Sequence, residues 1–123
     1  MIRWPALSLA LASVAATAHH GTSQYDMQRE VLLEGTVTEW RWSNPHAWLQ
    51  FEAVDAAGQR TQWSIESAPL GWLERNGWSS TTLARGEKIT VKISPTHVGE
   101  RSGIMREITH ANGETRVIRR PRF

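Results

Sequence analysis

The sequence predicts an all-β domain with one helix, in the form of a small Greek-key barrel of the oligonucleotide/oligosaccharide-binding (OB-like) type. Alternating apolar and polar residues mark a series of strands between residues 30 and 118. One helical pattern follows the third strand, which is where this barrel places its helix. The chain has no cysteine, so a closed sheet must supply the stability that disulfides give to other small domains. A small sandwich with a helical insertion is the competing fold.

Residues 1–18 have the features of a secretory signal peptide. Arg3 precedes an apolar run at residues 6–15 that is too short to span a bilayer, and a small-residue cleavage site ends at Ala18. We therefore expect cleavage there and a mature chain that begins at His19. This predicts a periplasmic or secreted protein with no transmembrane segment after cleavage. A membrane anchor or a buried amino-terminal helix is the alternative.

The mature chain is expected to divide into three parts. Residues 19–29 lack periodicity and are predicted to form an extended arm, residues 30–118 form the β-barrel domain, and residues 119–123 form a basic tail. The arginines in and before the tail would either tether the protein to an anionic surface or lie in a solvated, frayed terminus.

The first predicted strand, at residues 30–42, has the longest run of alternating side chains. It puts Val37 on the apolar, core side and Trp40 and Trp42 on the outer side. The apolar side stops after the valine, which indicates a bulge within residues 38–40 or a strand that curls from one sheet into another. Gly35 would allow such coiling, because it has no side chain to obstruct the neighbouring strand.

Three further strands are expected at residues 46–53, 59–66 and 87–94, with a hairpin turn at residues 55–58. Their inward positions form the predicted core, which consists of Leu49, Phe51, Trp63, Ile65, Ile89 and Val91. Their outward positions are polar, as at Glu52, Gln62 and Ser64.

One convincing helix pattern follows the third strand. Ser67 is its expected cap, Pro69 fits its first turn and Gly77 ends it. Trp72 and Trp78 flank the helix, and we expect them to plug one end of the barrel.

The carboxy-terminal part adds two strands. The fifth strand is predicted to place Ile104, Arg106 and Ile108 on one side. The turn signal at residues 112–113, Asn-Gly, then predicts that residues 115–118 double back as a short sixth strand.

Charge balance and the lack of catalytic motifs narrow the function. The full chain carries 14 basic and 12 acidic residues, and removal of the leader takes away one arginine. Specific nucleic-acid binding needs a clear basic excess, so we exclude it. The sequence shows no nucleophile elbow, phosphate loop, zinc-helix motif or paired-carboxylate spacing. We therefore expect a binding protein rather than an enzyme, with an unknown protein or small ligand as its partner.

Several short blocks of the chain resemble a family of small exported bacterial proteins of unknown function. The blocks are AHH at residues 18–20, LEGTV at 33–37, WSNPHAW at 42–48, WSIE at 63–66 and GEKITV at 86–91. The most specific block is the Asn-Pro-His-x-Trp motif at residues 44–48, which accompanies a His-His mature amino terminus. The resemblance implies an exported location and this fold, and it implies no established activity.

Cleavage of the leader would leave a free α-amino group on His19, beside its own imidazole and that of His20. An amine nitrogen with imidazole nitrogens suits Cu(II) above the other available divalent ions. His46, on the outer side after the Asn-Pro turn, is a candidate third ligand. Two alternatives stay open: a His-His terminus without function, and a turn histidine whose ring only binds backbone groups of the turn. His97 and His110 are expected to be ordinary surface histidines.

A second candidate site is an aromatic face. Trp40, Trp42 and Trp48 point outward if the strand phases hold, and Asn44 lies in the turn between them. Exposed indoles usually mark a contact surface, because burying each one would stabilise the core by about 2 kcal/mol. Barrels of this type bind ligands on this face. The alternative function is therefore a non-metal adaptor that docks a partner protein or a glycan, unless the arm or the carboxy-terminal segment covers the rings.

Overall fold

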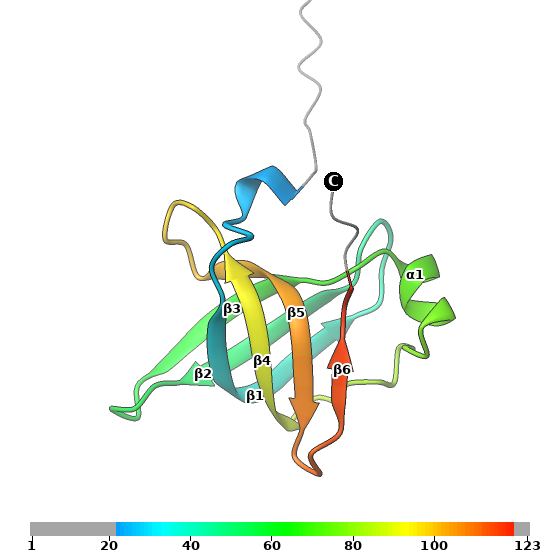
Figure 1. The fold of residues 1–123 in the computed structure, drawn as a ribbon. Helices are drawn as coiled ribbons and strands as arrows, with labels where there is room; N and C mark the ends of the chain where they lie inside the picture. Colours follow the sequence, from blue (N-terminus) through cyan, green and yellow to red (C-terminus); the bar gives the residue numbers. More distant parts are fainter. Residues whose placement is uncertain (1–21, 120–123) are drawn as a thin grey trace, which may run out of the picture.

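A computed structural model describes residues 22–119 of the chain, and this part forms one six-stranded sheet with one α-helix and one short 3-10 helix (Figure 1). The elements in chain order are η1 (Thr22–Gln24), β1 (Val31–Arg41), β2 (Trp48–Val54), β3 (Arg60–Glu66), α1 (Leu70–Arg75), β4 (Lys88–Pro95), β5 (Ser102–His110) and β6 (Thr115–Val117). The expected leader, His19, His20 and the end of the basic tail lie outside the described residues.

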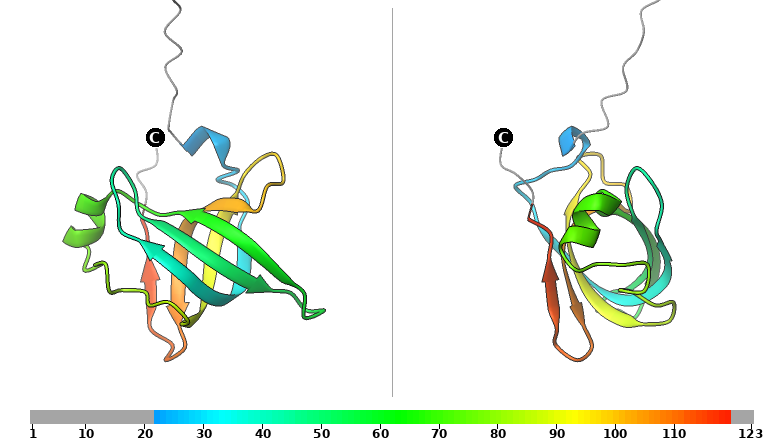
Figure 2. Two further views of the ribbon diagram at one scale, coloured as in Figure 1. Left: turned by 180° about the vertical axis from the view of Figure 1, so that it is seen from behind. Right: turned by 90° about the vertical axis from the view of Figure 1, so that its right-hand side faces the viewer.

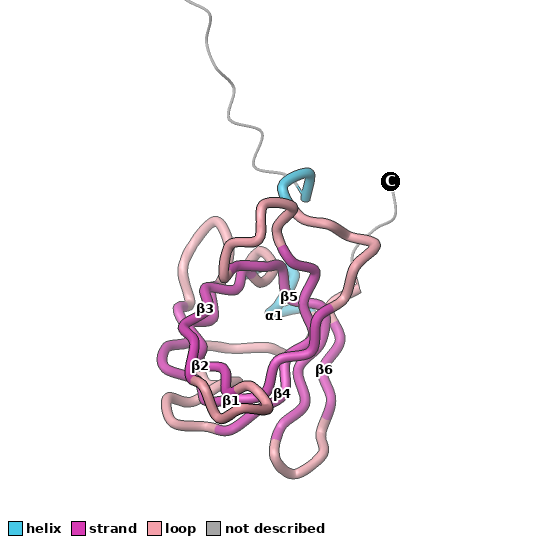
Figure 3. Tube along the Cα trace, turned by 90° about the vertical axis from the view of Figure 1, so that its left-hand side faces the viewer, coloured by secondary structure: helices cyan, strands magenta, loops and turns pink. Residues whose placement is uncertain are grey.

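The sheet closes into a five-stranded barrel. The strand order is β3-β2-β1-β4-β5-β6, and neighbouring strands are antiparallel. A short parallel pairing between residues 64–66 of β3 and residues 102–104 of β5 closes the first five strands of this row into a ring and leaves β6 outside it. Figure 3 looks into the barrel and shows β1 to β5 around a ring, with β6 outside it. This order and the helix between β3 and β4 confirm the predicted OB-like barrel.

Strand β1 belongs to both halves of the barrel. Its residues 31–36 pair with β4, while its residues 35–41 pair with β2. At the crossing point a Cβ atom on Gly35 would lie 1.9 Å from the carbonyl oxygen of Glu52, so only glycine permits this close approach. The register with β2 then shifts between Val37 and Glu39, which is the predicted bulge.

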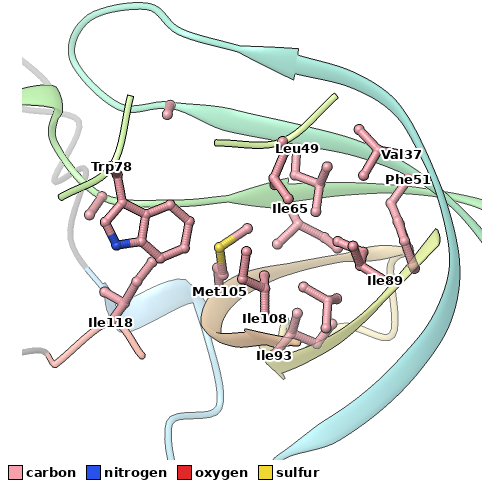
Figure 4. Packing of buried hydrophobic residues seen from close by; sticks show 14 of the residues in the cluster. Val37, Leu49, Phe51, Ile65, Trp78, Ile89, Ile93, Met105, Ile108 and Ile118 are labelled. Carbon is pink, nitrogen blue, oxygen red and sulfur yellow. The ribbon is translucent and has the colours of Figure 1, made fainter. Parts of the chain in front are cut away.

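The barrel interior is filled by side chains that alternate along the strands. Of the predicted core residues, Leu49, Phe51, Ile65, Ile89 and Val91 are buried. Trp63 is only partly buried, but it packs against this core. Its indole N–H donates to the Thr61 hydroxyl at 3.0 Å. Figure 4 shows the core running from Trp78 at one end to Phe51 and Ile89 at the other.

The predicted phase of the fifth strand is wrong after Ile104. Lys92 pairs with Glu107, but the next residue of β4, Ile93, pairs with Met105, so Arg106 is the extra residue of a bulge. Met105 and Ile108 therefore point into the core, and both are fully buried. The single inserted residue changes the face that each later side chain occupies.

The helix closes one end of the barrel, as expected. Figure 2 (right) shows α1 lying across the barrel opening. Trp78 is buried below it, and Trp72 packs against the core from the helix itself. The predicted cap is wrong, because the helix starts after Pro69 and no side chain caps it. Ser67 instead continues the barrel wall: its N–H donates to the Ala47 carbonyl at 2.8 Å, and its hydroxyl contacts the sulfur of Met105 at 3.6 Å.

Candidate functional site

The turn between β1 and β2 places His46 beside the last residue of β3. Ala47 exchanges backbone hydrogen bonds with residues 67 and 68, so the residue before it reaches the end of β3. Nδ1 of His46 lies 2.7 Å from Oε1 of Glu66. The ring thus turns Nδ1 toward the carboxylate, and Nε2 is the ring nitrogen that does not contact Glu66. The side chains of His46 and Glu66 are 25% and 12% exposed.

The same carboxylate binds a second residue. Tyr25 donates from its hydroxyl group to Oε2 of Glu66, and its side chain is only 3% exposed. Glu66 therefore joins a residue of the amino-terminal segment to the turn histidine. We refer to these three side chains as the His46–Glu66–Tyr25 chain.

The sequence had not singled out Glu66 or Tyr25. Glu66 was one of several glutamates at polar positions, and Tyr25 lay in a segment predicted to be an extended arm. That segment instead contains η1, and Tyr25 forms an isolated antiparallel bridge with Thr96. One signal was available for Glu66. Strand pairing sets Glu66 opposite Trp48 on the outer face, and Trp48 is only two residues after His46.

Two of the predicted outward tryptophans point inward, which corrects the expected aromatic face. After the bulge at Thr38, Trp40 lies opposite Leu49, a fully buried core residue, so the two share the core face. Trp42 is also partly buried against the core. The bulge lies within the predicted residues 38–40, and it transfers the side chains beyond it to the opposite face.

These rings form an aromatic cluster at the barrel end closed by α1. The ring centroids of Trp40 and Trp42 are 5.9 Å apart, and those of Trp40 and Trp78 are 6.1 Å apart. The indole N–H of Trp40 donates to the carbonyl of Ser79 at 3.0 Å. The segment after the helix is therefore what covers Trp40.

The remaining residues of the predicted aromatic face lie at the surface. Trp48 is partly exposed on the outer side of β2, with Arg41 and Glu66 as its partners on the neighbouring strands. Asn44 is exposed in the turn, where its peptide bond to Pro45 is cis. The surface that is left is smaller than the three-indole face that strand alternation predicted.

The other two described histidines differ from His46. His97 is exposed in the loop between β4 and β5. His110 is bonded through Nδ1 to Glu87, whose other carboxylate oxygen accepts from the N–H of Ala84 at 3.1 Å. His110 is therefore part of a local structural pair rather than an ordinary surface histidine.

No three His, Asp or Glu side chains within residues 22–119 converge as a metal site. Of the predicted ligands, only His46 belongs to the described part of the chain, because His19 and His20 precede it. A surface hollow of about 620 Å³ is lined by Glu34, Asp55, Lys88 and other residues that do not belong to the predicted site. Neither helix in the described part of the chain is long and apolar enough to cross a membrane.

Comparisons with known proteins place the chain in a family. Neither curated proteins nor solved structures give a match. A family model matches residues 7–106, which is most of the chain, and its description is "Family of unknown function (DUF6152)". The chain therefore belongs to this family of unknown function.

Proposed function

We propose that this protein is an exported, periplasmic binding protein that holds one Cu(II) ion at the amino terminus of its mature chain. The α-amino group and imidazole of His19 would form the main chelate, with His20 and His46 as further ligands. The observation that carries this proposal is the 2.7 Å contact between Nδ1 of His46 and the carboxylate of Glu66.

That contact resembles the arrangement typical of a metal-binding histidine. Metal-binding histidines almost always donate their second ring N–H to a carboxylate, a carbonyl or water, which fixes the tautomer and raises the basicity of the coordinating nitrogen. The 2.7 Å contact from Nδ1 to Glu66 places such a carboxylate beside one ring nitrogen of His46. The described residues offer no bond to Nε2, and a quarter of the side chain stays exposed. The ring is thus oriented and accessible before any metal arrives.

The donor types favour copper. Cleavage after Ala18 would supply an amine nitrogen, and His19, His20 and His46 would supply imidazoles. Nitrogen donors of this kind bind Cu(II) more tightly than the other common divalent ions of the first transition row. In this proposal the His-His terminus and the Asn-Pro-His-x-Trp motif, two of the features that carry the family resemblance, form one site.

The test compares two forms of the protein that differ by one residue. One begins at His19, and its matched control begins at Ala18, which moves the α-amino group out of the His19 chelate ring. Competition titrations with a copper chelator of known affinity should show one tight site in the first form and a weaker site in the second. Equal affinities, or a Kd weaker than about 1 μM in both forms, would mean that the terminal chelate is an accident of the cleavage site.

The adaptor function now depends on Trp48 alone among the three tryptophans. This ring lies on the outer side of β2, within the surface that OB-like barrels use for binding. The adaptor would dock a partner protein or a glycan there, with Asn44 at the edge of the contact. A protein that shows no copper affinity, but loses a captured partner or glycan on Trp48→Ala, would establish the adaptor in place of the metal protein.

A further inference from the structure

The barrel end closed by α1 carries a groove that the proposed function does not use. The groove has a volume of about 350 Å³ and lies between α1 and the residues that follow β6. Figure 1 shows α1 on the β6 side of the barrel. None of the lining residues belongs to the His46–Glu66–Tyr25 chain, so the groove is a separate candidate site.

The walls of the groove are mainly apolar, and the fold holds them in place. Ala68 and Ile118 line the groove and are buried, with exposures of 2% and 4%. The N–H of Ile118 donates to the Arg106 carbonyl at 2.9 Å, and Figure 4 shows Ile118 next to Trp78 at this end of the core. Trp72 also lines the groove, and it is partly exposed although it packs against the core. An apolar chain that lies in the groove would therefore leave water for a surface that already exists.

Two arginines give this apolar groove a positive charge. Arg75 and Arg119 both line it and are exposed. A Cβ atom on Gly71 would lie 3.3 Å from a guanidinium nitrogen of Arg75, so this group lies over the helix surface beside the groove. Neither arginine forms an ion pair with another residue of the range 22–119, and no acidic residue of that range lines the groove.

The charge and the apolar walls together define the ligand that would complement this surface. Guanidinium groups bind carboxylates through paired, charge-assisted hydrogen bonds. The apolar residues favour an aliphatic chain, which offers no polar groups that the walls would leave unsatisfied. The complementary ligand is therefore an amphipathic anion with one carboxylate and one apolar chain.

We propose that this groove binds a free medium-chain fatty acid. The aliphatic chain would lie on Ala68, Ile118 and the ring of Trp72, and the carboxylate would bind Arg75 and Arg119. The bound chain would exclude water from one side of the guanidinium groups, which strengthens their hydrogen bonds to the carboxylate. The proposed copper site contains none of these residues, so each proposal can fail without the other.

Isothermal titration calorimetry with decanoate tests the affinity on the chain that begins at His19 and ends at Phe123. A Kd tighter than about 1 mM is expected. Acetate has the carboxylate without the chain, and decyltrimethylammonium has the chain with the opposite charge. Both should bind at least about tenfold more weakly than decanoate. Equal affinities for decanoate and decyltrimethylammonium would indicate a general apolar surface and would overturn the proposal.

Arg75→Gln and Arg119→Gln test the contribution of the charge. Each variant changes an exposed side chain, so the barrel should remain folded. Each should weaken decanoate binding by about tenfold, because a hydrogen bond to a charged group is lost. The matched control is Arg85→Gln, since Arg85 is also exposed but does not line the groove. If the double variant at positions 75 and 119 keeps the wild-type affinity, the proposal is wrong.

Heteronuclear NMR locates the bound decanoate independently of its affinity. The largest chemical-shift changes should occur at the backbone amide of Gly71 and the indole N–H of Trp72. Trp48, which is partly exposed on the outer side of β2, is the reference and should shift little. Larger changes at Trp48 would place the ligand outside the groove and overturn the proposal. Decanoate binding by a chain that ends at Arg119, but not by the chain that ends at Phe123, would show that residues 120–123 are the occupant instead.

Discussion

Nδ1 of His46 lies 2.7 Å from Oε1 of Glu66, which joins the turn after β1 to the last residue of β3. The chain next to either residue would not by itself bring the two side chains together. The contact depends on the pairing of β2 with β3, because Ala47 bonds to residues 67 and 68 and so aligns the turn with the end of β3. The first prediction concerns this histidine.

His46→Ala should weaken Cu(II) binding by about tenfold without abolishing it, since one imidazole among several donors is lost. The matched control is His110→Ala, because His110 is also bonded through Nδ1 to a carboxylate but is not a predicted ligand. The control should retain copper affinity in the same competition titration. A copper loss in His110→Ala that equals the loss in His46→Ala would remove the special role of His46.

The exported protein should begin at His19. Residues 16–18, Ala-Thr-Ala, form the only well-placed cleavage site after the apolar run of the leader. Amino-terminal sequencing or intact mass of protein recovered from the periplasm measures this directly. A retained leader, or a start after His20, would take away the amine on which the copper proposal depends.

Copper affinity should fall as the pH is lowered. The α-amino group and the imidazoles must lose protons before they bind the metal, so protons compete with Cu(II) at each nitrogen. Titrations from about pH 8 to about pH 5 should show a steady loss of affinity, because imidazoles gain protons in this range. An affinity that does not vary over the same range would indicate oxygen ligands in place of these nitrogens.

Phe51→Ala should lower the free energy of unfolding by about 3–5 kcal/mol. Phe51 is fully buried at the centre of β2, so its removal leaves a cavity that the barrel cannot fill. Val54→Ala, at the exposed end of the same strand, is the control and should cost about 0.5 kcal/mol or less. Urea unfolding monitored by circular dichroism compares the two. Similar costs for both variants would contradict the assigned core.

Gly35→Ala should destabilise the barrel by about 1–3 kcal/mol or more, because the added Cβ would overlap the Glu52 carbonyl oxygen of the neighbouring strand. Gly71→Ala is the matched control. A Cβ at Gly71 meets only the flexible end of Arg75, and helix propensity favours alanine there by up to about 1 kcal/mol. Chemical unfolding of both variants should therefore give opposite signs. A neutral Gly35→Ala would mean that β1 and β2 separate easily at this point.

The sequence by itself determined the barrel, the order of its strands and most of its core. Strand alternation is a local property with a period of two residues, so it identified Leu49, Phe51 and Ile65 from the pattern of each strand alone. The helix between β3 and β4 was likewise readable from its own residues, and its position selected the OB-like fold.

Tertiary structure decided the faces beyond each bulge. A bulge inserts one residue, and a shift of one residue transfers every later side chain to the other face. Trp40 thus lies on the core side and not at the predicted surface, and Met105 shares the core with Ile108 in place of the predicted alignment of Ile104, Arg106 and Ile108. Where a bulge forms depends on the partner strand, which the alternation of a single strand does not contain.

The candidate site was decided in the same way. His46 was identifiable as a candidate from the motif around it, but its partners came from β3 and from the amino-terminal segment. Tyr25 and Glu66 are 41 residues apart in the chain, and no local pattern connects them. Their hydrogen bond exists because barrel closure brings the end of β3 to the amino-terminal segment, and a carboxylate that is 12% exposed needs polar partners.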